Sequence, residues 1–137
     1  SSAMYDAFAS LGFGPATPLQ FPAEASGRLR PWQSWQPIDK ATLSYGYGLS
    51  ASLLQMVQAY TVFARNGDRV DLRMTPVNGP VMGTPVFSAK TAAAVRDMLS
   101  QAAGPDGTGS RAQLEGFRVA GKTGTVHKSV AGEYFVI

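Results

Sequence analysis

A lysine, two threonines and two glycines close together mark where this chain could do chemistry. Residues 117–126 read FRVAGKTGTV, in which Lys122 is a cation and Thr123 and Thr125 carry hydroxyl groups. A positive charge beside hydroxyl donors suits the binding of an anionic group such as a carboxylate or a phosphate. Three interpretations are open: an ordinary surface strand, a nucleotide-binding loop, and an anion-binding edge strand in an acyl-transfer site.

The nucleotide interpretation comes from residues 116–123, GFRVAGKT, which match the phosphate-loop pattern G-x-x-x-x-G-K-[ST]. That pattern binds phosphate when a helix follows it, because the helix N-terminus and its backbone amides hold the anion. The residues after Thr123 read GTVHKSVAGEYFVI and favour strands and turns rather than a helix. We therefore expect no nucleotide binding.

As a strand over 117–126, the same residues alternate between two faces, with Lys122 on one side and Thr123 on the other. Gly121 and Gly124 leave little side chain near the middle, which indicates close approach by a ligand or another backbone. An unpaired amide on an edge strand could donate a hydrogen bond to a developing oxyanion. These features fit an acyl-transfer site, but the tripeptide Lys-Thr-Gly considered alone favours an ordinary surface strand.

Composition narrows the function classes. The 137 residues are 45% hydrophobic and 15% charged, which is typical of about one globular domain. The net charge of +3 is spread along the chain and forms no basic stripe, so we expect no nucleic-acid partner. The absence of cysteine excludes disulfides and thiol catalysis, and a single histidine argues against a zinc site. No apolar run approaches the roughly 20 residues of a membrane helix.

Apolar residues at helical spacing predict four helices, over 2–11, 38–43, 52–64 and 88–103. Ser52 and Gln55 form a predicted capping box at the start of the third, and Ser88 is the predicted cap of the fourth. The apolar residues of the helix over 52–64 are Leu53, Met56, Val57, Tyr60 and Phe63. For the helix over 88–103 we expect a buried stripe of Val95, Met98, Leu99 and Ala102. We expect irregular chain over 12–48, with packing roles for Trp32 and Trp35, and a flexible loop over 104–110.

The tripeptide Lys-Thr-Gly also occurs in serine acyltransferases that act on D-alanyl peptides. It stands here with GFGPATPLQFPAEASGRLRP, with YGYGLSASLLQMVQAYTVFARNG and with GTGSRAQLEGFRVAGKTGT, in that order. Together these stretches resemble the penicillin-binding transpeptidases, specifically the class B enzymes of the septal, cell-division type. The resemblance covers nearly the whole chain up to about residue 131.

The resemblance implies an α+β fold, part of the serine β-lactamase and penicillin-binding transpeptidase fold, with a helical part and an antiparallel sheet that is incomplete here. The family's other two motifs, Ser-x-x-Lys and Ser-x-Asn, do not occur in this sequence. Residues 1–137 are therefore expected to form the C-terminal part of a transpeptidase domain. The chain alone is expected to be inactive.

By the same resemblance, Lys122 supplies positive potential for the substrate carboxylate and for proton transfer. Thr123 and Thr125 hydrogen-bond the ligand, the Thr125 amide completes an oxyanion hole, and Gly124 permits close approach. Tyr45 and Tyr47 lie near the floor and rim of the family's cleft; aromatic packing beside glycine turns is the alternative. His127 is either a residue of the rim or a solvated histidine in a turn.

The implied activity is that of a peptidoglycan D,D-transpeptidase, whose serine lies outside this chain and is acylated by stem peptides ending in D-Ala-D-Ala or by β-lactams. The implied location is the periplasmic side of the inner membrane, with the anchor outside this chain. Division-complex proteins are expected partners, as is the other half of the domain as a separate chain; no cofactor is implied. The alternatives are a D,D-carboxypeptidase, a β-lactam-sensing relative, or a non-catalytic binding module.

Overall fold

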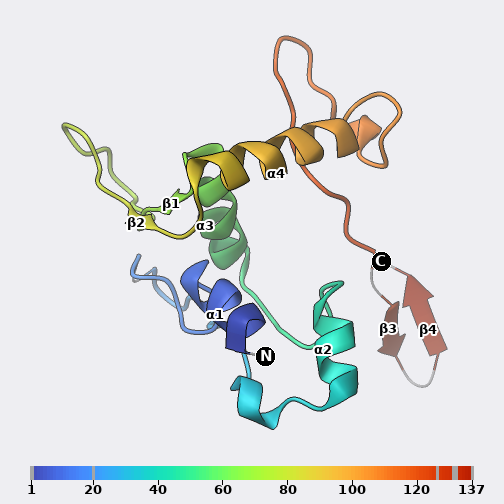
Figure 1. Ribbon diagram of the computed structural model, residues 1–137. Helices are drawn as coiled ribbons and strands as arrows, with labels where there is room; N and C mark the ends of the chain where they lie inside the picture. Colours follow the sequence, from blue (N-terminus) through green and yellow to red (C-terminus); the bar gives the residue numbers. More distant parts are fainter. Residues whose placement is uncertain (1, 20, 126, 131–132, 137) are drawn as a thin grey trace. The chain divides into compact units, whose positions relative to one another are not determined.

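The computed structural model describes residues 2–19, 21–125, 127–130 and 133–136, with side chains described up to residue 125 (Figure 1). The chain divides into two compact units, residues 1–93 and 94–137, and each is considered by itself. The helices are α1 (Ser2–Ser10), α2 (Pro37–Leu43), α3 (Leu53–Ala64) and α4 (Ala89–Ala102), with 3₁₀ turns η1 (Trp32–Ser34) and η2 (Ser110–Ala112). The strands are β1 (Asp68–Arg69), β2 (Thr84–Pro85), β3 (His127–Val130) and β4 (Glu133–Val136).

The four predicted helices are confirmed, and their ends follow the predicted signals. Gly12, at φ +96°, follows the end of α1 in the left-handed region that glycine adopts without strain. The Ser88 hydroxyl accepts a hydrogen bond from the Thr91 amide at 3.1 Å at the start of α4. Trp35 is buried and packs edge-on against Tyr5 with ring centroids 6.2 Å apart, which confirms its packing role.

Gln55 does more than the sequence predicts. It completes the capping box of α3, because the Ser52 hydroxyl accepts from the Gln55 backbone amide and the Gln55 side-chain oxygen Oε1 accepts from the Ser52 backbone amide. The fully buried Gln55 side chain also donates from Nε2 to the carbonyl oxygens of Gly14 and Pro15. One side chain therefore begins α3 and fixes the loop after α1.

The buried face of α3 is not the face on which the sequence places its apolar residues at helical spacing. Gln58, Ala59 and Val62 are buried, whereas Leu53 is 82% exposed and Val57 is 49% exposed. In α4, for which the sequence predicts a buried stripe, the prediction is wrong at Met98, which is 59% exposed. A spacing pattern identifies an apolar helix face but not the surface that covers it, and no described residue of this chain buries Leu53.

We expect Val62→Ala to lower the free energy of unfolding by about 2–3 kcal/mol, because it deletes two fully buried methyl groups and leaves a cavity. Val57→Ala, the same change on the exposed face of the same helix, should change it by less than about 0.5 kcal/mol. Urea unfolding of the two variants checks this. Equal losses would show that the α3 faces are assigned the wrong way round.

Antiparallel strands β1 and β2 pair Asp68 with Pro85 and Arg69 with Thr84. The turn into β1 centres on Gly67, whose amide donates to the Val62 carbonyl oxygen at 3.1 Å. The Gly67 carbonyl oxygen accepts from the amides of residues 86 and 87, each at 2.9 Å. Gly67 therefore joins the end of α3 to the segment that leads into α4.

The predicted strand over 117–126 is wrong in its bounds. Residues 117–125 pair with no other described residue in a ladder, and residue 126 lies outside the described residues. Pairing begins at β3, where His127 lies opposite Val136 of β4 and Val130 lies opposite Glu133. A β-prone sequence becomes a strand only when a partner backbone satisfies its amides and carbonyls, and here the partner starts at residue 133.

Within the described part of the chain, no helix is long and apolar enough to cross a bilayer. The same residues hold no group of three acidic or histidine side chains that could bind a metal ion.

Candidate functional site

The Lys122 side chain lies along the segment that follows it. Its Nζ donates to the Thr123 carbonyl oxygen at 3.1 Å and to the Thr123 hydroxyl at 3.0 Å, and both residues are exposed. The ammonium group is therefore exposed to the solvent and is held beside the Thr123 hydroxyl. An ammonium group in this position can bind a carboxylate with a charge-assisted hydrogen bond.

The Thr123 hydroxyl in turn donates to the Thr108 hydroxyl at 3.1 Å. Thr108 belongs to residues 104–110, for which the sequence predicts a flexible loop. The structure shows turns there, in which the amides of Gly107 and Gly109 donate to the carbonyl oxygens of Gly104 and Ala102 at 3.0 and 2.9 Å. The flexibility of this loop stays a prediction. Sequence reasoning missed Thr108; its position between the two glycines of residues 107–109 was the available signal.

The backbone around the lysine is open to close approach. No described atom lies within 4 Å of where a Cβ would stand at Gly121 or Gly124. Thr125 is exposed, and its amide donates to no residue that the structure describes. Thr125 thus has two features expected of an oxyanion donor, exposure and an amide without a partner among the described residues, while its catalytic role stays a prediction.

Tyr45 and Tyr47 belong to the first unit and follow α2. Their rings pack edge-on with centroids 5.7 Å apart, and Tyr45 is 66% exposed. The glycines between and after them, Gly46 and Gly48, have φ of +96° and +92°, which lets the chain turn beneath both rings. The packing interpretation is supported, and a role in the ligand cleft stays a prediction. The His127 side chain lies outside the described residues.

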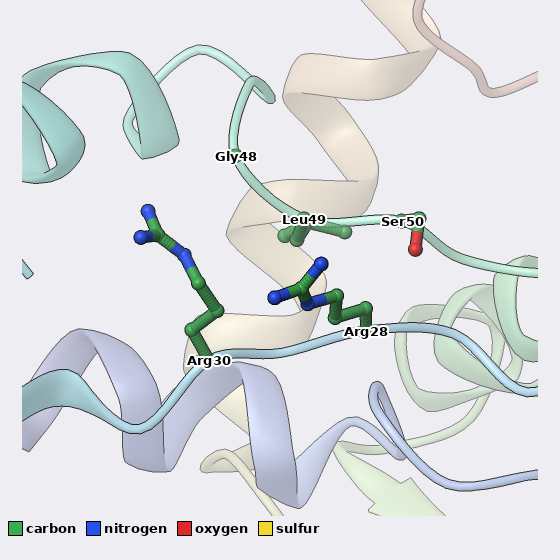
Figure 2. A pocket seen from close by; sticks show the side chains of 5 residues that line it. All are labelled: Arg28, Arg30, Gly48, Leu49 and Ser50. Atoms are coloured by element: carbon green, nitrogen blue, oxygen red, sulfur yellow. The ribbon is translucent and has the colours of Figure 1, made fainter. Parts of the chain in front are cut away.

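A surface depression of about 370 Å³ lies in the same unit, between the segment of Arg28 and Arg30 and the segment of residues 48–50 (Figure 2). A backbone bridge joins Arg28 to Ser50 across it. Arg30 is paired with Asp39 of α2 at 2.5 Å. The pKa of Asp39 is held below its usual value, first by the hydrogen bond from the Gln36 amide and then by the Arg30 guanidinium.

We expect Asp39→Asn to lower the urea midpoint at pH 7 and to have little effect at pH 2. A carboxyl with a lowered folded-state pKa adds stability above its unfolded-state pKa, and this stability is lost as the pH falls through the folded-state pKa. Urea unfolding at both pH values measures the difference, with exposed Asp71→Asn as control. A pH-independent gap between wild type and Asp39→Asn would contradict the assignment.

Comparison with known proteins gives one family. Residues 1–134 match the model described as the penicillin binding protein transpeptidase domain. The chain is 40% identical over 131 residues to the probable peptidoglycan D,D-transpeptidase PenA of Neisseria gonorrhoeae, covering 96% of this chain and 22% of PenA. It is 38% identical over 128 residues to the peptidoglycan D,D-transpeptidase FtsI of Escherichia coli K12, covering 93% of this chain and 22% of FtsI.

The solved structures that match this chain belong to the same family. The apo transpeptidase domain of Burkholderia pseudomallei penicillin-binding protein 3 matches with a TM-score of 0.89 and 43% identity, over 98% of this chain and 41% of that one. Penicillin-binding protein 3 of Mycobacterium tuberculosis in complex with ampicillin matches with a TM-score of 0.80 and 35% identity, over 96% of this chain and 33% of that one. The chain thus spans about a fifth of the curated relatives' length, and the α+β fold class is confirmed.

Proposed function

Because the chain belongs to the penicillin-binding protein transpeptidase domain family, we propose that it is the part of a peptidoglycan D,D-transpeptidase that carries the Lys-Thr-Gly segment. The observation that carries this proposal is the exposed Lys122 ammonium group, held beside the Thr123 hydroxyl on a segment whose glycines leave open space. A C-terminal D-alanine ends in a carboxylate, which is an anion that such an ammonium group binds with a charge-assisted hydrogen bond.

In the proposed reaction, a serine from another segment of the domain attacks the carbonyl carbon of the penultimate D-alanine. The serine oxygen–carbon bond forms, the peptide carbon–nitrogen bond breaks, and the terminal D-alanine leaves with a proton on its nitrogen. The amino group of a neighbouring stem peptide then attacks the ester carbon. The new peptide bond forms the cross-link, the serine oxygen–carbon bond breaks, and a proton from the attacking amine passes to the serine oxygen.

In both steps, the residues of this chain would stabilise charge on the ligand and hold the ligand in position. Lys122 would place positive potential at the substrate carboxylate and support proton transfer, and the hydroxyls of Thr123 and Thr125 would orient the ligand. The Thr125 amide would stabilise the oxyanion of each tetrahedral intermediate, which is the point of largest charge development. Gly124 would let the ligand backbone approach, and Tyr45, Tyr47 and the side chain at position 127 would line the cleft.

β-Lactams would be ligands of the same site, because their carboxylate and strained amide present the same groups as a D-alanyl-D-alanine end. The ampicillin complex of the Mycobacterium tuberculosis relative supports this. The similarity to FtsI supports a role in cell division, with division-complex proteins as partners on the periplasmic side of the inner membrane.

The exposed apolar face of α3 supports one further partner, the remaining part of the transpeptidase domain. Leu53, Met56, Val57 and Tyr60 are each between 38% and 82% exposed along one helix. Contiguous exposed apolar surface of this kind is typical of an interface. The remaining part of the domain, whether in the same polypeptide or in a separate chain, would cover it.

The function is tested with a protein in which this chain is joined to the N-terminal part and to any further part of the transpeptidase domain that its relatives have outside the matched residues. Incubated with a stem pentapeptide and a labelled D-amino acid acceptor, it should release D-alanine and incorporate the label. D-Alanine release without incorporation would indicate a carboxypeptidase. No release and no incorporation would indicate a binding module.

A further inference from the structure

We propose that Gln113 is a positioning residue for the Lys-Thr-Gly segment. It would act by holding residues 104–113 on the C-terminal end of α4, and from there on Thr123 through Thr108. The inference rests on the proposed function for its effect on catalysis, but the structural link can be measured without any activity.

The end of a helix leaves its last carbonyl oxygens without partners inside the helix. At the end of α4 the chain that follows satisfies the carbonyl oxygens of Gln101, Ala102 and Ala103. The Ala102 oxygen accepts from the Gly109 amide at 2.9 Å, and the Ala103 oxygen accepts from the Gln113 side-chain Nε2. Ala103 is only 1% exposed, so water cannot readily replace the Gln113 donor. Gln113 is thus the side chain that closes this loop.

The same helix end also fixes the backbone next to the lysine. The Leu99 carbonyl oxygen accepts from the Gly121 amide at 3.1 Å, one residue before Lys122. The closed loop then presents the Thr108 hydroxyl to the Thr123 hydroxyl. The Lys-Thr-Gly segment is therefore held at two points, one from α4 directly and one through the loop that Gln113 closes.

The loop of residues 104–113 packs closely on the C-terminal end of α4, which restricts where its backbone can lie. A Cβ at Gly107 would collide with the Ala102 carbonyl oxygen, so the loop backbone lies directly on the helix end. If the Gln113 donor is lost, this contact must loosen to let water reach the Ala103 oxygen. Thr108 would move with the loop, and a displacement of about 1 Å at a reacting group can cost up to about 100-fold in rate.

The test uses Gln113→Leu, which keeps the volume, and Gln113→Glu, which keeps the shape but replaces the donor with an acceptor. Gln101→Leu, at an exposed position of α4, is the matched control. In the protein that includes the N-terminal part of the domain, both Gln113 variants should lower the second-order rate constant of penicillin acylation about 10-fold. The control should leave it unchanged. The double variant Gln113→Leu/Thr108→Val should react no more slowly than Thr108→Val alone, because both act on the same contact.

Hydrogen exchange provides the readout that does not depend on activity. The Gly109 amide, which belongs to the loop that Gln113 closes, should exchange about 10-fold faster in Gln113→Leu than in wild type. Unchanged exchange would overturn the inference even if acylation were never observed. If wild type is acylated and both Gln113 variants react at the same rate as wild type, the inference is overturned as well. It is also overturned if the losses of Gln113→Leu and Thr108→Val add up in the double variant. Failure of wild type to be acylated would count against the proposed function instead, since the exchange result decides the role of Gln113 separately.

Discussion

Replacing Lys122 with alanine should lower the rate constant of penicillin acylation by about 10²- to 10³-fold, the loss typical when one preorganised donor is removed from a site of developing charge. The change deletes the ammonium group that donates to the Thr123 hydroxyl and, in the proposed site, the positive potential at the ligand carboxylate. Stopped-flow or quenched acylation kinetics measure the effect in the protein that includes the N-terminal part of the domain.

Two further variants show whether the loss of acylation rate comes from the ammonium group at position 122. Lys122→Arg keeps the charge but presents a planar fork instead of a compact ammonium group, so we expect an intermediate rate. Lys90→Ala removes an exposed lysine from the start of α4 and should react at the wild-type rate. A Lys122→Ala rate within twofold of wild type would remove Lys122 from the proposed mechanism.

Replacing Gly67 with alanine should lower the free energy of unfolding by about 3 kcal/mol. Gly67 has φ +91°, a conformation that costs an L-residue about 1–2 kcal/mol. A Cβ at this position would also collide with the Phe87 carbonyl oxygen, which is held because residue 87 bonds back to Gly67. The collision would disturb the stacking of Phe63 on Phe87, whose centroids are 5.8 Å apart.

Gly79 is the matched control for this prediction. Its φ is +95°, but no described atom lies within 4 Å of the position of its Cβ. Gly79→Ala should therefore cost only the conformational term of about 1–2 kcal/mol. Thermal or urea unfolding measures the loss of unfolding free energy in both variants. Equal losses would contradict the packing explanation.

Much of the helical structure could be predicted because its signals are local. The capping box of Ser52 and Gln55, the Ser88 cap and the glycine after α1 each act within one helical turn, and all three are confirmed. The family could be predicted as well, because Lys-Thr-Gly occurs with several other stretches in the family's order. The match over residues 1–134 confirms it.

Features that depend on a distant partner could not be predicted. The pattern of α3 showed an apolar face, but which face is buried depends on what packs against it, and Val62 rather than Leu53 is inside. Residues 117–125 have a strand-like composition without a described ladder partner. Gln113 has no motif at all, and only the fold shows that its amide reaches the Ala103 carbonyl oxygen.

Intact mass spectrometry after incubation with benzylpenicillin tests the central claim most directly. The protein that joins this chain to the N-terminal part of the domain should gain the mass of one opened β-lactam, and peptide mapping should place it on a serine outside residues 1–137. The 137-residue chain alone should gain nothing, since it contains neither Ser-x-x-Lys nor Ser-x-Asn. An unmodified longer protein, or an adduct on this chain alone, would contradict the assignment of these residues to the Lys-Thr-Gly part of a D,D-transpeptidase.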